Sequence, residues 1–399
     1  SPNVEKLAKR GVRFAQASAP MPTTDPSHVS LFTGLHPRTH GVVANGMKLP
    51  ESSLASLFTW AKAKGWATGA FVSRAHVNPW DLNLGSVDFV SGPEGRERRG
   101  DETLATAREW IAAHSQQPFL AWVHFFDPHG PYDPPKDFTE ASWRPAPLAN
   151  VERARQFQRR YSKATTDHLI ALYDTEIRYA DSLVGSLVAQ IEALPPLDAP
   201  TLWIVASDHG ETMTELMDRY GYAFDHGEFL YQGQLHVALV VTWPGRLPAG
   251  KVVETPVGLV DVAATVTELV DGASAFPTEG QSLAGALVRG EPVKRGPLFF
   301  ERKQLAADIQ TAKLTLKGGQ YALRIGNLKF IENEGGTPEL YDLAADPGET
   351  RNLAPSDPQV VGKLVAELNA WKTRSAERNL PLPSGEKLIE DLRALGYVQ

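Results

Sequence analysis

The sequence contains no cysteine among its 399 residues. This absence excludes disulfides, thiolate metal sites and a cysteine nucleophile, and it leaves the redox compartment undetermined. With 42% hydrophobic and 22% charged residues, the chain can still bury a large core. We therefore expect a globular protein with one large domain and a smaller appendage.

Net positive charge and long apolar runs are also lacking. The formal net charge is -7, so nucleic acid and an anionic membrane surface are not expected as partners, and a small anionic substrate needs a local positive centre. No apolar run of about 18 residues occurs, and the start of the chain forms neither a signal peptide nor an anchor. The compartment stays open: secreted or periplasmic if a signal precedes Ser1, and cytoplasmic otherwise. The oligomeric state also stays open.

Helical patterns alternate with short apolar runs along most of the chain. Asn3 has the residue type of a helix N-cap, and Gly11 is a typical helix stop. The expected helices cover 54–64, 103–113 and about 167–194, and the expected strands cover 12–14, 67–72, 119–126, 201–206 and 237–243. This alternation predicts an α/β domain with a mixed, mainly parallel sheet covered by helices on both faces.

The pattern changes after about residue 290. Residues 321–331 are typical of an antiparallel hairpin. We therefore expect a catalytic α/β domain over 1–290 and a small C-terminal subdomain of antiparallel sheet and helix over 291–399. The charge-rich segment 153–161 is expected to form a solvated helix.

Hydroxyl and imidazole side chains are concentrated between residues 23 and 41, on a turn that leads into a helix. Such a turn can present a hydroxyl to a metal at the positive N-terminus of the helix, where anions are favoured. Thr24 is therefore a candidate nucleophile. From the residues alone, a helix N-cap is the plainer interpretation of this threonine.

The same segment resembles the signature of the sulfatase-like hydrolases of the alkaline phosphatase superfamily. There a nucleophile, any residue, Pro, Ser and Arg lead through a Ser-x-x-Thr-Gly run to a His-Gly pair. The positions in register are Thr24, Pro26, Ser27, Ser30, Thr33, Gly34, His40 and Gly41. The resemblance implies the α/β sandwich of that superfamily and the hydrolysis of sulfate or phosphate esters.

Two positions depart from the sulfatase signature. Thr24 stands in place of the formylglycine precursor, and His28 stands in place of the arginine. A formylglycine hydrate expels sulfate by collapsing to the aldehyde, whereas a threonine ester must be hydrolysed by water. A phospho-threonine intermediate is ordinary chemistry for phosphoesterases of the superfamily. The departures therefore favour phosphate esters, with Thr24 and His28 as catalytic candidates.

Asp208 and His209 directly follow an expected buried strand, at the end where open α/β sheets build their sites. A carboxylate and an imidazole suit a divalent cation such as Zn²⁺, Mn²⁺, Ca²⁺ or Mg²⁺. Taken alone, the pair is at least as often a structural hydrogen bond. The similarity to the Asp-His-Gly metal motif of the family implies that Asp208, His209 and Thr24 bind the metal.

Three more residues take their roles from the resemblance. His129 corresponds to the histidine that contacts the sulfate or phosphate, and Asn45 to an amide that contacts the substrate in phosphonate and phosphate ester hydrolases. His226 falls near the residue for the leaving group, which it would protonate unless it binds a second metal. A turn histidine and an Asn-Gly turn without chemistry are the alternatives for His129 and Asn45. The Gly-Lys-x-His motif of the family is not preserved at 72–76; whether Ser73, Arg74 or His76 substitutes depends on a one-residue shift, so no role is assigned there.

The resemblance extends along the whole chain and is most specific at residues 339–353, which are similar to the C-terminal subdomain of the family. Family members open with an apolar strand that ends in one or two metal-binding aspartates, and this strand is not found after Ser1. We therefore expect a truncated chain whose sheet lacks a central strand and whose metal site lacks a ligand.

Together these features predict a metal-dependent hydrolase that acts through Thr24 on small anionic phosphate mono- or diesters. A true sulfatase for sugar or aryl sulfates is the first alternative. A non-catalytic anion-binding relative is the alternative from another class, favoured by the missing strand and by His28. A phosphoryl transferase is a third possibility, although the membrane spans and disulfides usual for that class are not visible.

Overall fold

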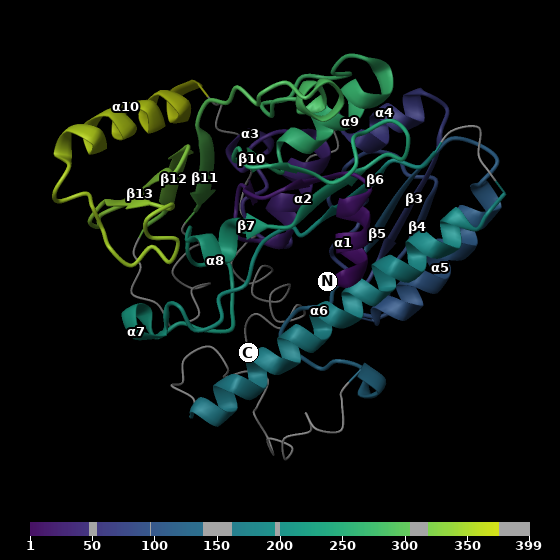
Figure 1. Ribbon diagram of the computed structural model, residues 1–399, viewed down its shortest axis with the longest axis horizontal. Helices are drawn as coiled ribbons and strands as arrows, with labels where there is room; N and C mark the ends of the chain where they lie inside the picture. Colours follow the sequence, from purple (N-terminus) through teal and green to yellow (C-terminus); the bar gives the residue numbers. More distant parts are fainter. Residues whose placement is uncertain (48–53, 96, 139–161, 196–199, 304–317, 375–399) are drawn as a thin grey trace.

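The larger part of the molecule consists of β-sheets enclosed by helices (Figure 1). The structure is a computed structural model that describes residues 1–47, 54–95, 97–138, 162–195, 200–303 and 318–374. The helix expected at 153–161 lies outside the described residues. Within those ranges, no helix combines the length and the apolar character needed to cross a bilayer.

One sheet is fully parallel. Its strands lie in the order β4 (Phe89–Ser91), β3 (Ala67–Val72) and β5 (Phe119–His124). The strands expected at 67–72 and 119–126 are therefore confirmed, the second ending at His124.

The other large sheet is mixed. It follows the order β6 (Trp203–Ala206), β8 (Leu239–Thr242), β1 (Val12–Phe14) and β9 (Lys251–Val253), with only the β1–β9 pair parallel. A small sheet joins β10 (Val257–Gly258), β2 (Ala17–Ser18) and β7 (His236–Val237). The run expected at 237–243 is thus divided between β7 and β8.

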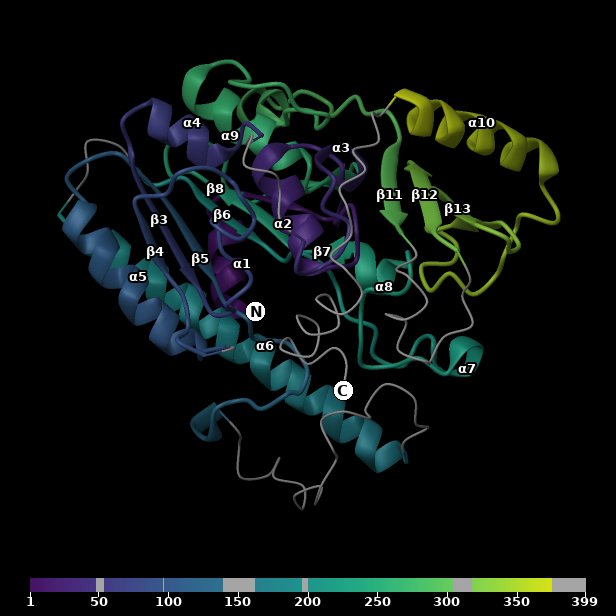
Figure 2. The ribbon, with the colours of Figure 1, turned by 180° about the vertical axis from the view of Figure 1, so that it is seen from behind.

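Helices cover both faces of the sheets (Figures 1 and 2). On β3, Phe71 packs with Trp110 of one helical layer, whereas the preceding Ala70 belongs to the core that contains Phe58. This alternation follows from the two-residue period of a strand. The first layer contains α1 (Pro2–Lys9), α5 (Gly100–His114) and α6 (Lys163–Glu192), and the second contains α2 (Thr24–Thr33), α4 (Leu57–Ala63) and α9 (Asp261–Asp271). The expected α/β class is confirmed.

Strands β5 and β6 are edges in the described part of the sheets. Each has one hydrogen-bonded neighbour there, β3 and β8 respectively. All residues of β5 and β6 are partly exposed despite their apolar sequences, whereas β8 is buried throughout. The expectation of a further central strand stays a prediction.

The C-terminal part forms an antiparallel sheet with a helix on one face. Its strands follow one another as β11 (Leu298–Arg302), β12 (Gln320–Ile325), β13 (Leu328–Asn333) and β14 (Glu339–Asp342). Helix α10 (Pro358–Arg374) packs on them through Trp371, whose ring stacks on Phe299 at 4.7 Å. The hairpin expected at 321–331 is confirmed, and the boundary at residue 290 stays a prediction.

Short helical turns connect the larger elements. They are α3 (Pro37–His40), η1 (Lys136–Phe138), α7 (Met217–Tyr220), α8 (Gln232–Leu235) and η4 (Gly285–Arg289).

Asn3 does not cap the first helix, so that expectation was wrong. Ser1 is the N-cap and Pro2 begins α1, as its fixed φ allows, so Asn3 lies in the first turn. Asp181 of α6 supplies the acceptor: its carboxylate receives the backbone N–H groups of Asn3 and Val4 at 2.9 to 3.1 Å. A distant carboxylate thus satisfies donors that a local cap would otherwise satisfy.

We expect Asp181→Ala to lower the free energy of unfolding by about 2 kcal/mol, because it leaves half-buried N–H groups at the start of α1 without an acceptor. Thermal and urea unfolding followed by circular dichroism measure the change. Asp167→Ala, at an exposed position of the same helix, is the control. Equal midpoints for both variants would refute the capping role.

Candidate active site

Thr24 is the first residue of α2 and is 3% exposed. The N-cap is the preceding Thr23, which has an extended backbone and makes no side-chain capping bond. The hydroxyl of Thr24 therefore lies at the positive end of a helix, where negative charge is stabilised.

Other residues of the signature hold the turn in place. Ser27 donates its hydroxyl to the Met21 carbonyl at 2.7 Å. The N–H of Val42 donates to His40 Nδ1 at 3.1 Å, so Nε2 of that ring carries the proton and contacts Ser30 Oγ at 2.9 Å. These buried side chains hold the turn that positions Thr24.

Asp208 and His209 follow β6 and lie beside Thr24. His209 Nε2 is 3.2 Å from Thr24 Oγ1 and 3.3 Å from Asp208 Oδ2. His209 Nδ1 donates to the Gly210 carbonyl at 2.9 Å, which leaves the lone pair of Nε2 directed to the other two groups in the neutral ring. A carboxylate, an imidazole and a hydroxyl meeting at one point fit a divalent cation.

Charge favours the ligand forms of both residues. Burial opposes ionisation of Asp208, but the neighbouring His209 and His28 outweigh it and lower its pKa to about 2. Burial also lowers the pKa of His209, so its imidazole is neutral near pH 7. An ionised carboxylate and a neutral imidazole can bind a metal without first losing a proton.

His28 lies one turn into α2. Its Nδ1 donates to the Thr24 carbonyl at 2.9 Å and is 3.7 Å from Asp208 Oδ2. The histidine in place of the signature arginine thus links the start of α2 to the candidate metal ligand.

His129 and His226 join the same cluster. The ring of His226 lies 4.1 Å from that of His209, and the ring of His129 lies 5.2 Å from that of His226. His129 also stacks on Phe126 and donates from Nδ1 to the Gly130 carbonyl at 2.6 Å. Burial lowers the pKa of both histidines. Five predicted residues, Thr24, Asp208, His209, His129 and His226, therefore lie side by side, and their catalytic roles stay predictions.

Asn45 contacts Asp25, the residue next to the candidate nucleophile Thr24. Its Oδ1 accepts the backbone N–H of Asp25 at 3.0 Å, and it is buried. The amide oxygen therefore supports the start of α2. Contact of Asn45 with a substrate stays a prediction.

The family model for sulfatases matches residues 1–273. The chain belongs to the sulfatase family. A second model, for the C-terminal region of N-sulphoglucosamine sulphohydrolase, matches residues 220–374. The protein is thus a hydrolase of ester bonds, in a family whose members depend on a divalent metal.

Similar proteins include sulfatases and a phosphonate hydrolase. A Delta 4,5-hexuronate-2-O-sulfatase of Bacteroides thetaiotaomicron is 24% identical over 94% of this chain and 84% of its own. The phosphonate monoester hydrolase of Agrobacterium radiobacter has a TM-score of 0.70 and 23% identity, covering 94% of this chain and 91% of its own. A protein solved with its substrate D-glucosamine-2-N,6-O-disulfate has a TM-score of 0.71 and 17% identity, covering 95% and 91%. At these identities the solved structures support the fold alone.

Sequence reasoning missed two histidines of this sulfatase-family site. His76 Nδ1 contacts Asp25 Oδ1 at 2.9 Å, beside Thr24. His124 ends β5, and its ring centre lies 5.3 Å from that of His28; burial, with the charge of His28, lowers the pKa of His124 to about 3. The position of His124 at the carboxyl end of a parallel strand was a usable signal, whereas no signal fixed the register of residues 72–76.

A buried acid supports the loop that carries His129. Glu176 of α6 accepts the backbone N–H of Asp133 at 2.6 Å, and burial raises its pKa from 4.5 to about 8. The folded protein therefore keeps a proton on Glu176 that the unfolded chain loses above about pH 4.5. By linkage, this group makes stability fall as pH rises from about 4.5 to about 8.

We expect Glu176→Gln to remove this part of the pH dependence, because the amide keeps an acceptor for Asp133 and does not ionise. Melting temperatures measured from pH 5 to pH 8 should decline less in the variant than in the wild type. Glu109→Gln, at an exposed position of α5, should keep the wild-type slope. Parallel slopes for wild type and Glu176→Gln would contradict the proposed protonation.

Proposed function

We propose that this protein hydrolyses phosphate mono- or diesters through a covalent phospho-Thr24 intermediate. The observation that carries the proposal is the 3.2 Å contact between Thr24 Oγ1 and His209 Nε2, with Asp208 beside them. A hydroxyl at a positive helix end, next to a neutral imidazole and an ionised carboxylate, is suited to attack an anionic ester.

A divalent cation would be held by Asp208, His209 and Thr24. Its identity among Zn²⁺, Mn²⁺, Ca²⁺ and Mg²⁺ stays open. When bound, such an ion lowers the pKa of the hydroxyl and neutralises charge on the transferring group. The Thr24 hydroxyl releases its proton to solvent, and its Oγ forms the new bond to phosphorus while the bond from phosphorus to the leaving oxygen breaks. His226 donates a proton to that oxygen, and His129 with Asn45 binds the other phosphate oxygens. Water then attacks phosphorus and cleaves its bond to Thr24, which restores the hydroxyl and releases phosphate from a monoester or a phosphate monoester from a diester.

Sulfate ester hydrolysis is the second candidate. It is supported by the sulfatase names of the relatives and by the C-terminal model of N-sulphoglucosamine sulphohydrolase. The residue Thr24 argues against it, because a threonine sulfate has no aldehyde to which it could collapse. Hydrolysis would then depend on water attacking sulfur, which the phosphate mechanism does not require.

We expect Thr24→Ala to reduce turnover of an aryl phosphate ester by at least about 10³-fold, because it removes the attacking oxygen. Its circular dichroism and melting temperature should remain close to wild type, since one hydroxyl and one methyl group are lost. Thr23→Ala, the neighbouring N-cap without a capping bond, is the matched control and should keep its activity. Activity of Thr24→Ala above about a tenth of wild type assigns the nucleophile elsewhere.

The substrate class is tested by a panel of aryl phosphate monoester, aryl phosphodiester and aryl sulfate, each with Zn²⁺, Mn²⁺, Ca²⁺ or Mg²⁺ added. We expect kcat/KM to be at least about 10-fold higher for one of the phosphate esters than for the sulfate. The reverse order would identify a sulfatase that works through threonine. Absence of turnover on every ester would support an anion-binding relative instead.

A further inference from the structure

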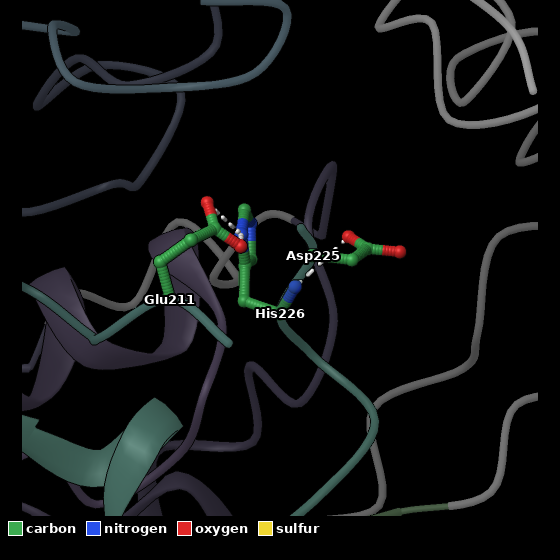
Figure 3. Close-up of side chains that lie close together, drawn as sticks. All are labelled: Glu211, Asp225 and His226. Carbon is green, nitrogen blue, oxygen red and sulfur yellow. Dashed lines mark hydrogen bonds and ion pairs between the residues drawn. The ribbon is translucent and has the colours of Figure 1, made fainter. Parts of the chain in front are cut away.

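A second group of potential metal ligands lies next to the candidate active site. Figure 3 shows Glu211, Asp225 and His226 close together, and one ligand atom from each lies within 4.8 Å of the others. Ligands of one cation are separated by at most twice the metal–ligand bond, or about 4 to 5 Å. The three side chains therefore meet the distance condition for sharing an ion.

The backbone holds these side chains together without an ion. The N–H of Thr212 donates to the Asp225 carbonyl at 3.0 Å, and the N–H of Asp225 donates back to the Thr212 carbonyl at 3.3 Å. This bridge places Glu211 opposite His226, whose Nδ1 is 3.3 Å from Glu211 Oε1. Phe224, just before the acid, has a φ of +53°, a conformation rare for a bulky residue. The arrangement is thus built into a defined turn.

A buried hydroxyl lies on a ring that packs against the turn before Asp225. Tyr132 is 6% exposed, its ring packs against Phe224, and its hydroxyl has no hydrogen-bond partner among the residues the structure describes. Burial raises the pKa of Tyr132, and the charge of Glu211 raises it further. Buried polar atoms normally have a partner, so this one indicates a missing ligand.

His226 carries a second buried polar atom without a hydrogen-bond partner among the described residues. It is 8% exposed, and its Nε2 also has no partner in the described part of the chain. Within the same ranges, neither Glu211 nor Asp225 forms an ion pair with lysine or arginine. Buried carboxylates are usually paired with a cation or bound to a metal.

We propose that Glu211, Asp225 and His226 bind a second divalent cation, separate from the one expected at Asp208 and His209. Carboxylate oxygens with one imidazole suit Mn²⁺ or Zn²⁺ better than Ca²⁺, which prefers oxygen ligands only. The inference goes beyond the proposed function, because it holds for either class of ester.

An ion at this site has a consequence for His226. Nδ1 faces Glu211 and is the ring atom available to the ion. Coordination through Nδ1 leaves the ring proton on Nε2, the atom without a partner. Without the ion, the same proton belongs on Nδ1 for donation to Glu211. The cation would therefore set the tautomer that can donate a proton away from the cluster.

The test is titration of the metal-free full chain with Mn²⁺, followed by isothermal calorimetry and by the electron paramagnetic resonance of free Mn²⁺. Asp225→Asn and Glu211→Gln should each weaken one Mn²⁺ binding event by at least about 10-fold, while Asp208→Asn should keep that event. Glu215→Gln, an exposed acid on the same loop, removes equal charge and should bind as the wild type does. Zn²⁺ and Ca²⁺ titrations establish the preference.

Circular dichroism of every variant shows whether the chain is folded, and the two site variants are judged separately. Unchanged Mn²⁺ affinity in a folded Asp225→Asn or Glu211→Gln variant overturns the proposal. So does loss of the same event in Asp208→Asn, which would assign it to the first site, or an equal loss in Glu215→Gln. Because binding is measured without a substrate, failure of the ester hydrolase proposal does not alter this result.

Discussion

The site depends on one contact between two distant parts of the chain, Thr24 Oγ1 with His209 Nε2 at 3.2 Å. Thr24 comes from the start of α2, in one helical layer, and His209 from the loop after β6. Helix α2 is fixed by the buried core that holds Val29 and Phe32, and β6 by its antiparallel pairing with β8. The metal-binding geometry therefore rests on the packing of a helix against a sheet.

The C-terminal sheet serves the same site by holding the segment that carries His226. The Tyr231 hydroxyl donates to Glu339 Oε2 at 2.7 Å, and Arg219 Nη1 donates to the Tyr341 hydroxyl at 3.0 Å. Lys329 and Glu349 of the C-terminal part form a fully buried ion pair at 2.7 Å. Removing one partner of such a pair would leave an uncompensated buried charge. These contacts therefore favour one position of the segment that carries His226. Figures 1 and 2 show α7 and α8 beside this subdomain.

Sequence patterns predicted the parts of this architecture that depend on periodicity and on local motifs. The strands β3, β5 and β6 follow from apolar runs, whereas the proximity of Thr24 and His209 was implied by the resemblance to the sulfatase signature and to the Asp-His-Gly motif of the family. The cap of α1 by Asp181 could not be predicted, because it joins residues 178 positions apart. The contact between His76 and Asp25 spans 51 positions and joins a turn to the first turn of α2. The side chains of Glu211 and Asp225 meet through one isolated backbone bridge, which has no sequence period.

The carboxylates of the site differ in pKa, and this difference bears on cation binding. Asp208 and Glu211 are neighbours in the sequence, yet the pKa of Asp208 is lowered to about 2 while burial raises that of Glu211 to about 8. The difference follows from their surroundings: His209 and His28 outweigh the burial of Asp208, whereas burial of Glu211 outweighs the opposing effect of His209, and the acids Asp208 and Glu215 add to it. Burial therefore disfavours charge on Glu211 unless a positive group is added. A cation bound at the proposed second site would supply that charge.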